Sequence, residues 1–199
     1  MDYSNIGFVF RGAIMQIIVF SAIPFIWWRI KHKKEVGFRE FIGLTKPISG
    51  TTTKNIIIAL IAYWIIWGML FFIYGSAGSS FHGMGAKAII PALIVCFLQN
   101  GLCEEILLRG FLLKRLCAKM NFLSANSLHA LIFALLHIGV IGENSTLFGI
   151  LFILLQPFIG GWMLGYVSQK LFKGSIIPSV ILHGLGNYIL RIMDAFMLL

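Results

Sequence analysis

Residues 88–113 read AIIPALIVCFLQNGLCEEILLRGFLL, and this stretch decides the class of fold. It is long and apolar enough to cross a bilayer, because about 20 apolar helical residues span the hydrocarbon core. It nevertheless contains Glu104, Glu105 and Arg109. Ionisable side chains at membrane depth are costly, so they usually face a protein interior or a wet cavity and indicate function. The stretch therefore predicts a membrane helix that carries part of a functional site.

The composition of the whole chain also indicates a membrane protein. Of its 199 residues, 59% are hydrophobic and 12% are charged, and the mean hydropathy is +0.92. A soluble domain of this length cannot bury so much apolar surface. The formal charge of +9 suggests nucleic acid at first sight, but the basic residues lie in short runs between apolar spans. Such runs are typical of loops that face anionic lipid, so we expect the lipid bilayer, and no nucleic acid, among the partners.

The apolar stretches predict an all-α, polytopic membrane protein with about six transmembrane helices. The expected spans are residues 7–28, 55–75, 88–113, 123–141, 147–168 and 175–198. Within this single membrane domain, residues 1–87 would hold two N-terminal helices with a basic inner loop. Residues 88–199 would form a four-helix catalytic core.

Basic and non-basic connections alternate along the chain, which predicts its orientation. The connections at 31–54, 114–121 and 169–174 are rich in Lys and Arg, whereas those at 75–87 and 142–146 hold one basic residue between them. Basic loops stay on the inner side, so both termini are expected outside. The first span has no basic segment before it and is not expected to be a cleavable signal peptide.

The first inner connection contains a candidate surface helix. Apolar residues recur among the charges of residues 31–54, and in an amphipathic helix they would dip into the lipid. These residues are Val36, Phe38, Phe41, Ile42 and Leu44.

The third span combines a predicted ion pair with an unpaired acid. Glu105 and Arg109 are four residues apart with the acid first, the favoured order for a helical pair. Glu104 lies one step round the helix with no local cation, which makes it a candidate general base. The alternative is that both acids pair with basic groups elsewhere. Cys103 points about 100° away from Glu104, so we expect a packed thiol, not a nucleophile.

Two further spans carry polar pairs at helical spacing. Phe133 and His137 share a face of the fourth span, and His183 and Asn187 share a face of the last. An imidazole beside an amide suits the stabilisation of an oxyanion. The structural alternatives are a hydrogen-bonded core histidine and a polar contact between helices. His129 lies about 12 Å along the helix from His137, so we expect it to pack.

The ordered set Glu-Glu-x-x-x-Arg, Phe-x-x-x-His and His-x-x-x-Asn resembles the CAAX-protease and bacteriocin-processing (CPBP) family of intramembrane proteases, also called the ABI family. The resemblance covers residues from about 88 to 190. It implies that Glu104 activates a water and that His137 orients this water. It also implies that His183 and Asn187 hold the oxyanion, with Glu105, Arg109 and Phe133 in support.

The resemblance further implies a glutamate-dependent endopeptidase that needs no cofactor. Zinc is the less favoured alternative, with Glu104, His137 and His183 as ligands, because no His-x-x-x-His pair occupies one helix and Asn is a poor zinc ligand. The expected substrate is a membrane-associated peptide or protein at a bacterial cell membrane. The expected role is peptide processing or bacteriocin self-immunity. The sequence itself selects neither a prenylated substrate nor an oligomeric state.

Two other classes of function fit the same residues. In a proton- or metal-coupled transporter, Glu104, His137 and His183 would form a relay, although the chain has no visible inverted repeat. A non-catalytic membrane immunity or scaffold protein would use the same groups only for packing. Unlike the protease, this last class predicts an unchanged phenotype for Glu104→Ala.

Overall fold

The computed structural model describes residues 3–48, 53–74, 80–140 and 147–198. These residues form helices and turns and contain no strand, which confirms the all-α prediction. The long elements are α1 (Ile6–Lys31), α3 (Thr53–Tyr74), a composite helix from Gly85 to Cys117, α6 (Phe122–Leu135), α7 (Leu147–Tyr166) and α8 (Ile177–Ala195). Each predicted span thus corresponds to one long helix.

The composite helix is irregular around the acidic motif. It runs through η1 (Gly85–Ala88), α4 (Ile89–Leu93), η2 (Ile94–Leu102), η3 (Glu105–Leu113) and α5 (Lys114–Cys117). Both η2 and η3 are π-helical, a rare geometry that is frequent at functional sites, and Glu104 lies between them. The composite helix has 33 residues, more than the about 20 that a helix needs to cross the hydrocarbon core.

Within the described part of the chain, two helices are long and apolar enough to cross a membrane. They are Ile6–Lys31 and the composite helix Gly85–Cys117. Helix α1 leaves large apolar side chains exposed along its length, among them Ile14, Met15, Ile18 and Val19. Exposed apolar surface of this extent favours a lipid environment over water.

The fourth predicted span is too long at its C-terminal end. Helix α6 ends at Leu135, and a turn and η4 (Ile138–Val140) follow, so the expected helix to residue 141 was wrong. The His137 ring explains the ending, because its Nδ1 donates to the Phe133 carbonyl at 2.8 Å. In a continuing α-helix the backbone N–H of His137 would donate to the Phe133 carbonyl. Here it donates to the Ala134 carbonyl instead.

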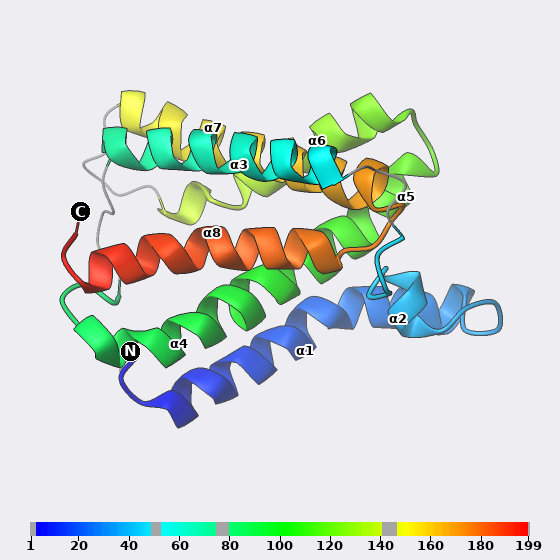
Figure 1. The fold of residues 1–199 in the computed structure, drawn as a ribbon. Helices are drawn as coiled ribbons and strands as arrows, with labels where there is room; N and C mark the ends of the chain where they lie inside the picture. The colour runs from blue at the N-terminus through cyan, green and yellow to red at the C-terminus, as the bar shows by residue number, and fades with distance from the viewer. Residues whose placement is uncertain (1–2, 49–52, 75–79, 141–146, 199) are drawn as a thin grey trace.

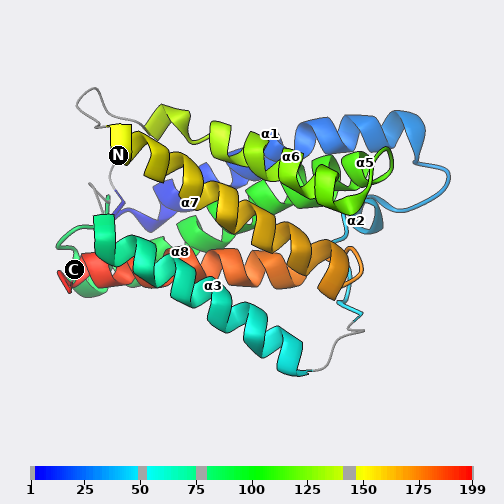
Figure 2. The same cartoon turned by 90° about the horizontal axis from the view of Figure 1, so that it is seen from above.

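Helix α8 lies in the middle of the bundle. Figure 1 shows α3, α6 and α7 on one side of it and α4 and α1 on the other, and Figure 2 shows α3 and α7 crossing it. The contact of α8 with η2 is close because glycines meet there. A Cβ on Gly101 would lie 3.5 Å from the Cα of Gly184, and one on Gly184 would lie 2.5 Å from Phe97 Cδ1.

The three basic connections meet at one end of the bundle. Ser175 Oγ donates to the Thr45 carbonyl at 2.8 Å, Ile176 N donates to the Gly43 carbonyl, and Lys114 Nζ lies 3.4 Å from the Phe41 carbonyl. Helix α1 begins and helix α8 ends at the opposite end of the bundle (Figures 1 and 2). The connection at 142–146 and the first part of 75–87 lie outside the described residues.

The predicted surface helix takes a different role from the one expected. Helix α2 (Phe38–Phe41) has four residues, and Phe41 and the following Ile42 are buried against Ile106 and Ile176. The prediction that these two side chains dip into lipid was wrong. The cause is the turn at Gly43, where φ is +76°, which returns the chain toward the bundle so that Ile42 packs against the composite helix.

Candidate active site

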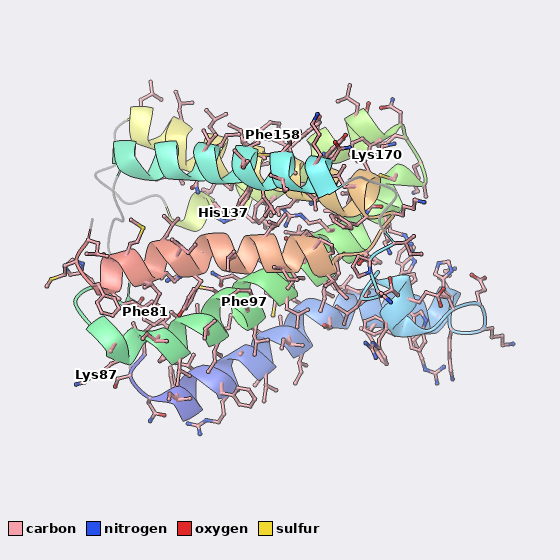
Figure 3. All side chains as sticks on the ribbon, in the orientation of Figure 1. Phe81, Lys87, Phe97, His137, Phe158 and Lys170 are labelled. Carbon is pink, nitrogen blue, oxygen red and sulfur yellow. The ribbon has the colours of Figure 1, made fainter. Side chains whose placement is uncertain are left out.

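The structure brings the three predicted motifs to one cavity. This cavity has a volume of about 250 Å³, and its lining includes Glu104, Phe133, His137, His183 and Asn187. The composite helix supplies Glu104, the end of α6 supplies Phe133 and His137, and α8 supplies the last two. His137 lies between the layer of α3, α6 and α7 and the central α8 (Figure 3).

Behind the cavity, Glu105 and Arg109 form the predicted ion pair. Arg109 Nη1 lies 2.9 Å from Glu105 Oε1, and both side chains have no exposed surface. Arg109 Nη2 is 3.4 Å from the Gly161 carbonyl of α7. The spacing of four residues placed the two charges on one helix face, and burial makes each dependent on the other.

His183 joins this ion pair to the cavity. Its Nδ1 lies 3.0 Å from Glu105 Oε1, within hydrogen-bond range, while its Nε2 lies 3.8 Å from Glu104 Oε2. Because an ionised carboxylate can only accept, Nδ1 carries the proton in the first contact. The second distance is too long for a direct hydrogen bond. The ring is therefore held by Glu105, and its other nitrogen faces Glu104.

Glu104 differs from Glu105 in both exposure and partners. About a fifth of its side chain (21%) is exposed, and His183 is the one basic side chain of the described residues within 4.0 Å of it. Cys103 is fully buried, and its Sγ lies 3.0 Å from the Leu98 carbonyl, as expected of a packed thiol. The carboxylate of Glu104 thus faces the cavity free of a strong ion pair.

Phe133 packs against three basic groups of the site. Its ring centroid is 4.6 Å from Arg109 Cζ, 4.8 Å from the His137 ring and 6.3 Å from the His183 ring. The contact with Arg109 has cation–π geometry. His129 is fully buried two turns earlier and does not line the cavity, as predicted.

The comparison with known families identifies this arrangement. A family model described as type II CAAX prenyl endopeptidase Rce1-like matches residues 86–189, just over half of the chain. The chain belongs to the Rce1-like family. No curated protein and no solved structure matches it. Membership of the Rce1-like family implies a membrane-embedded protease, in agreement with the resemblance drawn from the three motifs.

The Rce1-like match covers the motif residues and leaves α1 and α3 outside. Both helices nevertheless pack against the matched segment, α1 on η2 and α3 on α7 and α8. Within the described residues, no group of three or more His, Cys, Asp and Glu side chains is placed to hold a metal ion.

Four polar side chains that the motifs did not predict also line the cavity: Tyr63, Asn100, Gln156 and Arg191. Two of them had a signal in the sequence. Asn100 lies one turn before Glu104, and Arg191 lies one turn after Asn187, so each continues a face already assigned to the site. Tyr63 and Gln156 had none, because only the packing of α3 and α7 brings them to the cavity.

Proposed function

We propose that this member of the Rce1-like family is an intramembrane endopeptidase that hydrolyses a peptide bond of a membrane-associated peptide or protein through a water activated by Glu104. The observation that carries the proposal is the division between two adjacent acids. Glu105 is fully buried and holds Arg109 and His183, whereas Glu104 faces the cavity. Of the two carboxylates, only Glu104 is placed to take a proton from a water beside a substrate.

In such a reaction Glu104 first accepts a proton and later returns it, so the proton transfers balance. Its carboxylate removes a proton from the water as the oxygen attacks the scissile carbonyl carbon. The carboxylic acid then returns the proton to the leaving amine as the tetrahedral intermediate collapses. Supporting this, the His137 Nδ1–H is committed to the Phe133 carbonyl, which leaves Nε2 to orient the water.

His183 and Asn187 are placed to hold the oxyanion. They share one face of α8 and both line the cavity. Since His183 Nδ1 already donates to Glu105, a second donation from Nε2 requires the doubly protonated ring. Positioned donors of this kind act on charge that develops in the transition state.

An apolar groove favours a substrate that carries a lipid. The groove has a volume of about 390 Å³ and lies between α3 and α7. Its lining residues Ala62 and Met163 are chain neighbours of Tyr63 and Leu164, which line the cavity. A prenyl chain could occupy this groove while its cysteine enters the cavity. We further propose that the basic end of the bundle faces the cytoplasm and that both termini lie outside.

The test compares newly formed peptide termini in membranes that contain the wild type or Glu104→Gln at equal abundance, measured by mass spectrometry. Glu104→Gln preserves shape but removes the base, so termini that depend on the protease should vanish. Glu35→Gln is the matched control, because Glu35 is exposed and lies outside the site. Equal termini in wild type and Glu104→Gln would contradict the proposal.

Metal dependence is tested on the same membranes. We expect proteolysis to persist after treatment with 1,10-phenanthroline. Activity that is lost with the chelator and restored by zinc would instead assign Glu104, His137 and His183 as ligands.

A further inference from the structure

We propose that the side-chain amides of Gln156 and Asn100 bind the main chain of the substrate, in an extended conformation, beside the scissile bond. Gln156 belongs to α7 and Asn100 to the composite helix, and both line the cavity that holds Glu104. The inference rests on the proposed function and adds to it two residues that bind the peptide main chain.

The hydrogen bonds of the side-chain amides are the first observation. Among the described residues, seven Asn and Gln side chains are buried or half-buried. Four of them lie outside the cavity, and each donates a hydrogen bond within the protein: Gln16, Gln99, Asn126 and Gln169. The side chains of the other three form no hydrogen bond with the described part of the chain, and all three line the cavity: Asn100, Gln156 and Asn187. The unpaired amides of the bundle are thus confined to the cavity.

The positions of the three amides are the second observation. Figure 1 shows α7 on one side of α8 and the composite helix, labelled α4, on the other. Gln156 and Asn100 therefore come from helices on opposite sides of α8, which carries Asn187. The proposed function assigns His183 and Asn187 to the oxyanion. The amides of Gln156 and Asn100 remain for the main-chain groups on either side of the scissile carbonyl.

The chemistry of the peptide main chain explains why amides suit this place. A peptide bound in an extended form has N–H and C=O groups without intrahelical partners, and such groups are costly inside an apolar bundle unless they are hydrogen-bonded. A side-chain amide offers both a donor and an acceptor, so it can bind either main-chain group. It is also neutral and therefore adds no charge beside Glu104.

A different role for Asn100 would be to position Glu104, which lies four residues later on the same helix. The structure argues against this role, because no hydrogen bond joins the two side chains. The pH dependence of kcat/KM tests the point. Asn100→Leu should lower kcat/KM and leave the shape of its pH profile unchanged, whereas a residue that acts through Glu104 would shift the profile.

The experiment removes one main-chain hydrogen-bonding group of the substrate at a time. The probe is a fluorescent S-farnesylated peptide ending in Cys-Val-Ile-Met, in which each peptide bond other than the scissile one is replaced in turn by an ester, which lacks the N–H. We expect Gln156→Leu to lower kcat/KM for the all-amide peptide by about 5- to 50-fold, the range for a buried group that loses its partner. One ester should cause a similar loss in the wild type and less than about twofold further loss in Gln156→Leu. Asn100→Leu should couple to an ester in the same way. Gln169→Leu, the same change outside the cavity, is the control.

Three results would overturn the proposal. The first is a wild type that cleaves every ester peptide as fast as the all-amide peptide. The second is a Gln156→Leu variant that loses the same factor with every peptide, which is the mark of a packing role. The third is an Asn100→Leu variant with a shifted pH profile, which would assign Asn100 to Glu104. Because the readout is a ratio between peptides, partial unfolding of a variant does not change it.

A binding measurement separates this proposal from the proposed function. Fluorescence anisotropy with the same peptides is carried out in the Glu104→Gln background, with and without Gln156→Leu. We expect the all-amide peptide to bind about tenfold more tightly than at least one ester peptide, and Gln156→Leu to abolish this difference. If the wild type binds these peptides and cleaves none, proteolysis of this substrate class fails, while the binding ratios still decide the role of Gln156. Equal binding of all peptides, or no binding of any, refutes that role.

Discussion

Glu104 and Glu105 are adjacent in the chain but belong to two regions with opposite properties. The cavity, with Glu104, His137 and Asn187 in its wall, is partly exposed. The buried layer behind it holds polar side chains with no exposed surface, namely Glu105, Arg109, Asn126, His129, Ser168 and Ser179. A single step round a helix separates a carboxylate that faces the cavity from a neighbour that is buried in an ion pair.

His183 is the side chain that touches both regions. Its Nδ1 bonds to the buried Glu105, and its Nε2 faces Glu104 in the cavity. The comparison therefore predicts that substitutions in the buried layer reduce stability, and that substitutions in the cavity wall reduce kcat. Four variants test that separation.

Arg109→Met should destabilise the protein by about 3–5 kcal/mol, because it leaves the Glu105 carboxylate buried without its cation. The free energy of unfolding in detergent micelles measures the effect, with Arg11→Met as the exposed control. The double variant Glu105→Gln/Arg109→Met should recover much of the loss, since it removes both charges. A stable Arg109→Met protein would contradict the structural role of this layer.

Asn187→Ala should lower kcat by about 10²- to 10³-fold, the usual cost of removing one oxyanion donor. Its free energy of unfolding should stay within about 1 kcal/mol of the wild type, since Asn187 is only half-buried in the cavity wall. Steady-state kinetics on a cleaved peptide gives the first quantity. A raised KM with unchanged kcat would show that Asn187 binds the substrate without acting on the transition state.

Gly184→Ala should cost about 1–3 kcal/mol of stability, because the new Cβ would lie 2.5 Å from Phe97 Cδ1. The change forces α8 away from η2 and should therefore affect both regions at once. Gly139→Ala is the matched control, since a Cβ there has no neighbour within 4 Å. Phe97→Leu in the Gly184→Ala background should restore part of the stability, and an additive double variant would disprove this contact as the cause.

His129→Leu should change the free energy of unfolding by less than about 1 kcal/mol and kcat by less than about threefold. The His129 ring is fully buried, and among the described residues no side chain hydrogen-bonds to either ring nitrogen. An apolar side chain of similar size therefore leaves no side-chain partner unsatisfied. Thermal unfolding and the same peptide assay measure both quantities. A loss of activity at full stability would move His129 into the functional site.

The sequence predicted those features that depend on spacing within one helix. The Glu105–Arg109 pair, the six long helices and the membership of the three motifs in one site all follow from periodicity, composition and order. Features that depend on contacts between distant segments were not predictable. Examples are Tyr63 of α3 in the cavity and the burial of Phe41 and Ile42 against the composite helix.

The end of α6 was missed for a different reason. Hydropathy stays high beyond Leu135, so composition alone predicts a helix that continues past this residue. A hydrogen bond from the His137 side chain to the Phe133 carbonyl ends it, and such competition between side chain and backbone has no signature in hydropathy.

The hydrogen bond from the His137 ring that ends α6 also fixes the tautomer of this ring. With the proton held on Nδ1 by the Phe133 carbonyl, Nε2 is left as the acceptor, and this is the nitrogen to which the proposed mechanism assigns the water. Truncation of this side chain would free the Phe133 carbonyl for the backbone N–H of His137, so that α6 could continue past Leu135. His137→Ala would therefore mix a loss of chemistry with a change of backbone path. His137→Gln, whose amide can still donate to the same carbonyl, is the substitution that separates the two.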